Sequence, residues 1–343
     1  MLKMSFALAA FVLLGSAAPG SAQTQNASAS PREQFKNAIA QYDWVTNAKG
    51  QKIRTIITRP KNASGKVPAI FFVGWLSCDS VEYVNGETDS FGAIFWRLIE
   101  QSGFATMRMD KPGVSESEGN CAVTDFQAEL DSYQKAFASL AKYPFIDQGK
   151  IFVIGLSNGG GTAPLSVGTH PIRGFIAASS WGRTWYEHML EMERKSLDRD
   201  SNRTPAQANS GIKGLTDFYS LYLIHGKTPG EIIKDHPEWK SLWHDDPDGQ
   251  YGRPAAFYQQ LQALNLGKIW QDVSAPVLVL HGTADTIMSH ADSIAIADTV
   301  NRAHPGHAEF IEMDGGDHLL ASHNKLLDSV VPKILDWMHK QLK

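Results

Sequence analysis

The chain has 343 residues, of which 43% are hydrophobic and 20% are charged, a balance typical of a soluble globular enzyme or binding protein. This composition excludes a disordered chain and a fibrous repeat. The 32 basic and 36 acidic side chains give a formal charge of -4, so no strong field favours nucleic acid or anionic lipid, and we expect neither as a partner.

The first 22 residues have the pattern of a secretory signal peptide. Lys3 supplies a short positive region, residues 6–14 are apolar, and small residues precede a cleavage site near Gln23. The apolar run is too short for a membrane anchor, which needs about 20 residues, and no other stretch is apolar enough to span a bilayer. The sequence therefore predicts a periplasmic or secreted protein without a membrane span, with residues 23–40 as a flexible leader.

Short apolar runs alternate with helical patterns along most of the remaining chain. The strand-like runs, rich in β-branched and aromatic residues, lie at 68–74, 104–110, 150–155, 172–178, 276–282 and 308–313. The helical patterns lie at 91–101, 126–142, after 157, at 291–303 and at 325–341. This alternation predicts βαβ units around a mostly parallel sheet, and a hairpin within residues 44–58 makes the sheet mixed.

Residues 181–270 interrupt the alternation with several helical patterns and few strand-like runs. We interpret this segment as an inserted helical cap, which leaves 41–180 and 271–343 as the α/β core. The segment is rich in aromatic residues, which either line a substrate cleft or, as is more common at helical spacing, form the core of the cap itself.

The segment Gly155-Leu-Ser157-Asn-Gly159 fits the pattern Gly-x-Ser-x-Gly. Its glycines let a strand turn sharply into a helix and hold the serine in a strained, exposed position. The five-residue pattern alone is weak evidence for a nucleophilic serine. Here, however, it follows a predicted strand and precedes a helical pattern, as the motif requires. Ser157 is therefore the predicted nucleophile, and the N-terminus of the following helix favours a developing oxyanion beside it.

A serine nucleophile needs a histidine base and a carboxylate that orients the histidine. Of the 12 histidines, His318 follows a predicted strand directly, whereas most of the others fall in the cap or beside a helix. Asp285 stands just past the end of the preceding strand and is the expected carboxylate. Asp317 is the alternative, although a carboxylate adjacent in sequence to the histidine does not easily face its ring.

The order Ser157, Asp285, His318 on alternating strands and helices resembles the α/β-hydrolase fold family, over nearly the whole mature chain. The segment 110–119 also resembles a family loop that shapes the floor of the active site. The resemblance implies that the backbone N–H groups of Trp75 and Asn158 form the oxyanion hole. The family's His-Gly turn here reads Val73-Gly74-Trp75, without the histidine.

Cys78 and Cys121 are the only cysteines, and in an oxidising compartment such a pair normally forms a disulfide. Two unrelated buried thiols are the alternative. The resemblance implies that the strands preceding the two cysteines are neighbours, so we expect the bridge beside the active site.

These observations predict an exported serine hydrolase, an esterase that cleaves small ester or acyl substrates through an acyl-enzyme intermediate. A peptidase of prolyl-oligopeptidase type and a non-catalytic ligand-binding protein on the same fold are the alternatives. No cofactor or metal is expected, because neither the histidines at 304 and 307 nor the aspartates at 245–248 have a zinc or EF-hand spacing.

Overall fold

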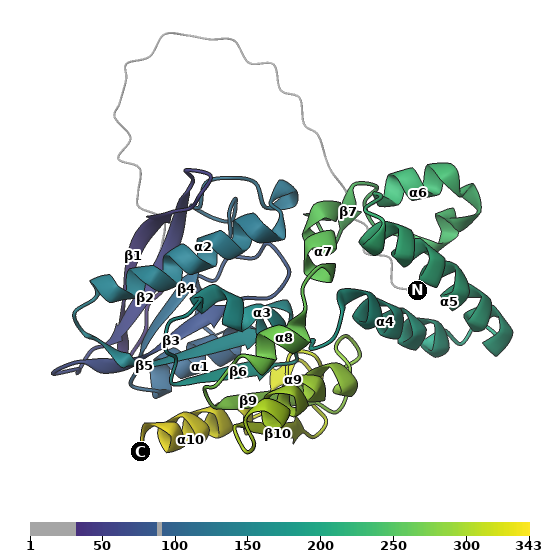
Figure 1. Ribbon diagram of the computed structural model, residues 1–343. Coiled ribbons are helices and arrows are strands. Elements are labelled where there is room, and N and C mark those ends of the chain that lie inside the picture. The colour runs from purple at the N-terminus through teal and green to yellow at the C-terminus, as the bar shows by residue number, and fades with distance from the viewer. Residues whose placement is uncertain (1–31, 88–90) are drawn as a thin grey trace, which may run out of the picture. The chain divides into compact units, whose positions relative to one another are not determined.

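The computed structural model describes residues 32–87 and 91–343, and its centre is an eight-stranded sheet (Figure 1). The strands lie in the order β1-β2-β4-β3-β5-β6-β9-β10. The pairs β1–β2 and β2–β4 are antiparallel and all other neighbours are parallel, which confirms the predicted mixed, mostly parallel sheet. The bounds of the strands are β1 Ala38–Thr46, β2 Lys52–Pro60, β3 Val67–Val73, β4 Ala105–Met109, β5 Ile146–Leu156, β6 Gly174–Ala178, β9 Val277–Gly282 and β10 Ala308–Met313.

Helices cover both faces of the sheet because successive side chains of its buried strands point to opposite sides. Phe71 and Val153 belong to the core on one face, whereas their neighbours Ile70 and Phe152 belong to the core on the other. The first face is covered by α2 (Phe126–Ser139), α3 (Asn158–Val167), α8 (Leu266–Gln271) and α9 (His290–Ala303), and the second by α1 (Phe91–Gln101) and α10 (Val330–Leu342).

The chain between β6 and β9 is mostly helical, and we call residues 181–270 the helical insertion. Its aromatic side chains pack mainly on one another: Phe218 stacks on Trp243 with ring centroids 5.0 Å apart, and Tyr222 is fully buried. The elements of the insertion are α4 Trp185–Arg199, α5 Pro205–Tyr219, η3 Ser220–Ile224, α6 Pro229–Asp235, η4 Pro237–Leu242, β7 Gly249–Gln250, β8 Arg253–Pro254, α7 Ala255–Gln262 and α8. Most of these aromatic residues therefore form a core, and a few line the pocket described below.

Two predicted boundaries differ from the structure. The predicted leader extends to residue 40, but β1 begins at Ala38, and Glu33 is already buried because its carboxylate pairs with the buried guanidinium of Arg108. The helix predicted from residue 325 begins only at Val330, because Lys325–Leu326 forms strand β12 and pairs with β11 (Ala321–Ser322). A proline at the third helical position, where its missing N–H costs nothing, is consistent with this later start.

The predicted signal peptide, residues 1–22, and the leader as far as residue 31 lie outside the described residues. From Arg32 onward the chain forms one compact unit. None of the helices in the described part of the chain is long and apolar enough to cross a bilayer.

Candidate active site

Ser157 lies at the sharp turn between β5 and α3. Its backbone φ is +54°, a value that residues other than glycine rarely adopt. The turn depends on its glycines. A Cβ on Gly155 would lie 2.4 Å from the carbonyl oxygen of Gly159, and a Cβ on Gly159 would lie 2.3 Å from that of Gly74. The motif therefore serves two purposes, because it strains the serine backbone and also lets the turn approach the end of β3.

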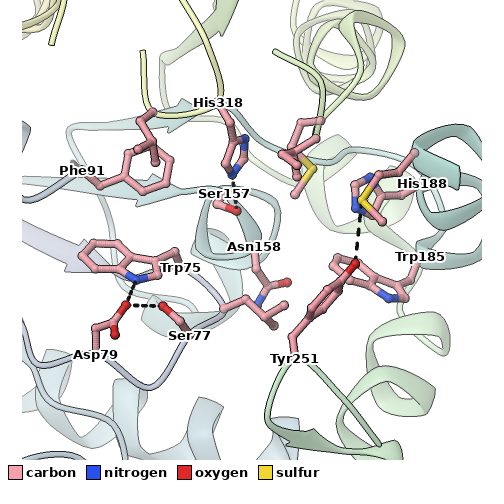
Figure 2. A pocket seen from close by; sticks show the side chains of 15 residues that line it. Trp75, Ser77, Asp79, Phe91, Ser157, Asn158, Trp185, His188, Tyr251 and His318 are labelled. Carbon is pink, nitrogen blue, oxygen red and sulfur yellow. Dashed lines mark hydrogen bonds between the residues drawn. The ribbon is translucent and has the colours of Figure 1, made fainter. Parts of the chain in front are cut away.

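Three side chains from the carboxyl ends of three strands meet at this turn. His318 Nε2 lies 3.0 Å from Ser157 Oγ, and His318 Nδ1 lies 3.0 Å from Asp285 Oδ2 (Figure 2 shows the first contact). Ser157 follows β5, Asp285 follows β9 and His318 follows β10, so the parallel sheet brings their loops to one edge. The structure thus places the three predicted residues in a continuous hydrogen-bonded chain.

Asp285 faces the histidine ring and Asp317 does not. Asp285 Oδ1 accepts hydrogen bonds from the backbone N–H groups of Ile287 and Met288, which leaves Oδ2 for His318. Asp317 Oδ1 instead accepts the N–H groups of Leu319 and Ala321 in its own loop. A carboxylate oxygen accepts only, so Nδ1 of His318 carries the proton and Nε2 is free to accept one from Ser157.

The loop after β3, residues 74–79, forms the other side of the site, and we call it the β3 loop. Trp75 and Asn158 both line the pocket that contains Ser157 and His318. Within the described part of the chain, neither the Trp75 nor the Asn158 backbone N–H has a hydrogen-bond acceptor. Both donors are therefore available to an oxygen atom in the pocket, which is what an oxyanion hole requires.

Side chains from distant elements hold the β3 loop in place. Tyr133 of α2 accepts the N–H of Gly74 at 3.0 Å, and Lys111 Nζ donates to the carbonyl oxygens of Trp75 and Ser77, the latter at 2.7 Å. Burial and the positive charge of Arg253 lower the pKa of the Lys111 ammonium well below its usual value. The loop is therefore fixed by a buried amine that has few other partners.

A disulfide joins Cys78 of the β3 loop to Cys121, with 6.1 Å between the two Cα atoms, which confirms the predicted pairing. Cys121 begins the short helix η1 (Cys121–Val123). The guanidinium of Arg253, from the helical insertion, donates to the Cys121 carbonyl at 3.2 Å and also pairs with Glu129 of α2. The bridge and this arginine tie together three segments that are far apart in the sequence.

The cavity over Ser157 has a volume of about 470 Å³ and a mainly apolar lining. In Figure 2, Trp75, Phe91 and Asp79 lie on one side of Ser157, and Trp185, His188 and Tyr251 lie on the other. The ring of Phe91 meets the His318 ring edge-on at 5.4 Å. The site therefore has room for a small, largely apolar molecule that extends in both directions from the serine.

Comparison with known families agrees with this geometry. The family model described as serine aminopeptidase, S33, matches residues 85–324. The chain belongs to this family of α/β hydrolases. It is a serine hydrolase, and its eight-stranded sheet with flanking helices is the fold of the family. A search of curated proteins found no match.

Solved structures of low sequence identity share the fold of this S33-family hydrolase. The ferulic acid complex of Est1E from Butyrivibrio proteoclasticus is 16% identical over 88% of this chain and 99% of its own, with a TM-score of 0.58. A thermophilic esterase from Thermogutta terrifontis is 18% identical over 88% and 100%, with a TM-score of 0.52. Acetyl xylan esterase 1 from Thermoanaerobacterium sp. is 14% identical over 91% and 86%, with a TM-score of 0.55.

Several residues of the hydrolase site carry no local signal in the sequence. Lys111, Tyr133 and Arg253 contact the β3 loop from other elements, and His188 lines the pocket from the helical insertion. Only the position of Lys111 in the family-like loop at 110–119 pointed toward the site. No group of three or more metal-binding side chains suited to an ion occurs within residues 32–87 and 91–343.

Proposed function

We propose that the protein is an exported carboxylic ester hydrolase that works through an acyl-enzyme intermediate. The observation that carries the proposal is the hydrogen-bonded chain Ser157–His318–Asp285 at the floor of a mainly apolar cavity. A serine in this setting becomes a nucleophile because a neighbouring base removes its proton as it attacks.

In the first half of the reaction, Ser157 Oγ attacks the ester carbonyl while its proton moves to His318 Nε2. Asp285 stabilises the imidazolium that forms, and the N–H groups of Trp75 and Asn158 donate to the oxyanion. His318 then gives the proton to the leaving alkoxide, the bond from carbonyl carbon to that oxygen breaks, and an alcohol departs. The acyl group remains on Ser157.

In the second half, water takes the place of the alcohol. His318 removes a proton from the water as it attacks the acyl carbonyl, and returns that proton to Ser157 Oγ when the acyl–oxygen bond breaks. The products are a carboxylic acid and the free enzyme. The buried carboxylate of Asp285 and the turn at Ser157 are fixed by backbone contacts, so the site needs little reorganisation between the two steps.

A serine aminopeptidase is the second candidate, because the matching family model bears that description and a carboxylate also lines the pocket. Asp79 Oδ2 accepts the indole N–H of Trp75 at 3.2 Å and lies in an exposed part of the loop. An α-amino group of a peptide is a cation that such a carboxylate attracts. Parallel assays with p-nitrophenyl acyl esters and amino-acid p-nitroanilides separate the two activities.

Export is part of the proposal. The Cys78–Cys121 disulfide and the signal-like pattern of residues 1–22 support it, since disulfides persist in oxidising compartments. N-terminal sequencing of protein from the periplasm or culture medium tests it, with a mature start near Gln23 as the expected result. An unprocessed chain in the cytoplasm would contradict export without affecting the catalytic proposal.

The catalytic proposal is tested with a fluorophosphonate probe and a panel of p-nitrophenyl esters. We expect the probe to label Ser157, identified by mass spectrometry of the modified peptide, and the wild type to hydrolyse esters. Ser157→Ala should lose labelling and several orders of magnitude in kcat, because the base has no hydroxyl to activate. Labelling elsewhere, or activity of Ser157→Ala within tenfold of wild type, would reject the proposal. Absence of both labelling and turnover in a folded wild type would favour a non-catalytic binding protein.

A further inference from the structure

A second histidine lies in the pocket, and the proposed mechanism does not use it. His188 belongs to the first turns of α4 in the helical insertion, and it lines the same cavity as Ser157 and His318. Only 3% of its surface is exposed. Figure 2 shows it with Trp185 and Tyr251, across Ser157 from Trp75 and Phe91.

A buried carboxylate fixes the ring of His188. His188 Nδ1 lies 3.5 Å from Asp292 Oδ2, and Asp292, in the first turn of α9, is fully buried. Asp292 is itself held by Arg183, whose Nε donates to Oδ1 at 3.0 Å, and by the hydroxyl of Ser289. Burial alone would raise the pKa of Asp292, but its hydrogen bonds with His188 and Arg183 lower the pKa to about 2.

The group that contacts Nδ1 of His188 decides whether Nε2 donates or accepts a hydrogen bond. An ionised carboxylate has no proton to donate, so Nδ1, which faces Asp292, carries a hydrogen. With one proton on the ring, Nε2 presents a lone pair. The contact of the His188 ring with a charged group runs through Nδ1, and within residues 32–87 and 91–343 no hydrogen bond joins Nε2 to another residue. In a protein interior such a nitrogen normally has a partner, and here the pocket is the place from which one can come.

The walls around His188 are apolar, aromatic or weakly polar. The indole of Trp185 packs against the His188 ring with centroids 4.7 Å apart, which restricts its rotation. The Tyr251 hydroxyl donates to the sulfur of Met192 at 3.9 Å, and a thioether is a weak acceptor. The indole N–H of Trp185 is also buried without a hydrogen-bond partner in the described part of the chain. This side of the pocket therefore combines a flat apolar surface with polar groups that lack strong partners.

We infer that His188 is a specificity-determining residue, and that its Nε2 accepts a hydrogen bond from a hydroxyl group on one half of the substrate. The inference rests on the proposed ester hydrolysis and names the class of ester: one whose apolar or aromatic half, lying between Trp185 and Tyr251, carries a hydroxyl. Tyr251 offers a second polar contact from the same side. A desolvated acceptor discriminates strongly against an analogue without the hydroxyl, because that analogue leaves Nε2 buried and unpaired.

The test uses matched esters that differ by one hydroxyl. The first series comprises methyl 3-phenylpropanoate and its 2-, 3- and 4-hydroxyphenyl analogues. The second comprises 2-phenylethyl acetate with the same three ring substitutions, so the hydroxyl is presented on either half of the ester. The measured quantity is the ratio of kcat/KM between each hydroxylated ester and its parent.

Four variants are compared with the wild type. His188→Phe keeps an aromatic ring against Trp185 and removes both nitrogens, while His188→Gln keeps a polar atom near the position of Nε2. His225→Phe is the matched control, because His225 is exposed in the same helical insertion and does not line the pocket. Melting temperatures show whether each variant folds, and Tyr251→Phe provides a further folded variant if His188→Phe does not.

We expect at least one wild-type ratio of roughly tenfold or more in favour of the hydroxyl. This ratio should fall to near one in His188→Phe, recover in part in His188→Gln and stay at the wild-type value in His225→Phe. If His188→Phe does not fold, a reduced ratio in both His188→Gln and Tyr251→Phe supports the subsite. Wild-type ratios all below about twofold, or a ratio that survives removal of the His188 ring, would overturn the inference. Hydrolysis without hydroxyl preference rejects only this subsite, whereas absence of any ester turnover rejects the proposed function itself.

Discussion

The two sides of the Ser157 hydroxyl are built in different ways. On one side, Ser157, Asp285 and His318 each follow a strand of the parallel sheet by a few residues, and backbone contacts near each residue fix the loops. On the other side, the chain from residue 74 to residue 87, which contains the β3 loop, forms no helix or strand. It depends on Tyr133, Lys111 and the disulfide.

Because of this difference, one side of the site can be recognised from short sequence motifs, whereas the other side depends on contacts made by the whole fold. The positions of Ser157, Asp285 and His318 can be recognised from the ends of predicted strands, because a parallel sheet gathers those ends at one edge. In the proposed mechanism the β3 loop presents one N–H at a fixed distance from Ser157, and several elements distant in sequence supply the contacts that hold the loop. Substitutions on the two sides should therefore differ in kind as well as in size.

The largest effect is expected on the side of Ser157, Asp285 and His318, where we propose that the Asp285 carboxylate orients the base. Asp285→Asn should lower kcat/KM for ester hydrolysis by about 10⁴-fold, because the amide favours the wrong histidine tautomer and does not stabilise the imidazolium. The matched control is Asp317→Asn, in the His318 loop, whose carboxylate caps backbone N–H groups instead of the ring. Steady-state kinetics with a single p-nitrophenyl ester measure both. A larger loss in Asp317→Asn would reassign the carboxylate.

The disulfide should matter most for the stability of the β3 side. Cys78 and Cys121 are 43 residues apart, and the chain-entropy model gives about 4 kcal/mol for a loop of this size. We expect the double variant Cys78→Ser, Cys121→Ser to melt roughly 10 °C below wild type, since a domain of this length loses a few degrees per kcal/mol. Calorimetry with and without a reductant measures the change. Reductant should have no effect on the double variant, and an unchanged melting temperature in reduced wild type would contradict the expectation.

A smaller effect, on kcat alone, is expected when the buried amine of Lys111, which contacts the β3 loop, is removed. Lys111→Met removes the donor to the Trp75 and Ser77 carbonyls while keeping the length of the side chain. The loop should then hold the Trp75 N–H less accurately, and kcat should fall by roughly ten- to a hundredfold with little change in KM, as for a lost oxyanion interaction.

Lys52→Met, at an exposed position of β2, is the control for removing a lysine. If Lys111 has only a packing role, Lys111→Met would lower the melting temperature and leave kcat unchanged. That result would show that the β3 loop keeps its position without the amine, and the contrast between the two sides of the site would be weaker than described.

The sequence by itself determined the order of strands and helices, the turn at Ser157 and the candidate base. These features are local: the alternation of side chains along a strand and the glycines around a serine act through neighbours in the chain. For the carboxylate, Asp285 contacts the His318 ring, whereas Asp317, next to the histidine in sequence, is directed into its own turn.

Only the tertiary structure decided which side chains complete the site. Lys111 reaches across 36 residues to the Trp75 carbonyl, and Asp292 on α9 fixes His188 on α4, contacts that no spacing in the sequence predicts. The burial of Glu33 within the predicted leader was likewise missed, because it depends on Arg108 in a strand far along the chain. Hydrogen bonds and ion pairs between distant elements form only once the sheet and its helices have brought those elements together, and so they leave no local pattern.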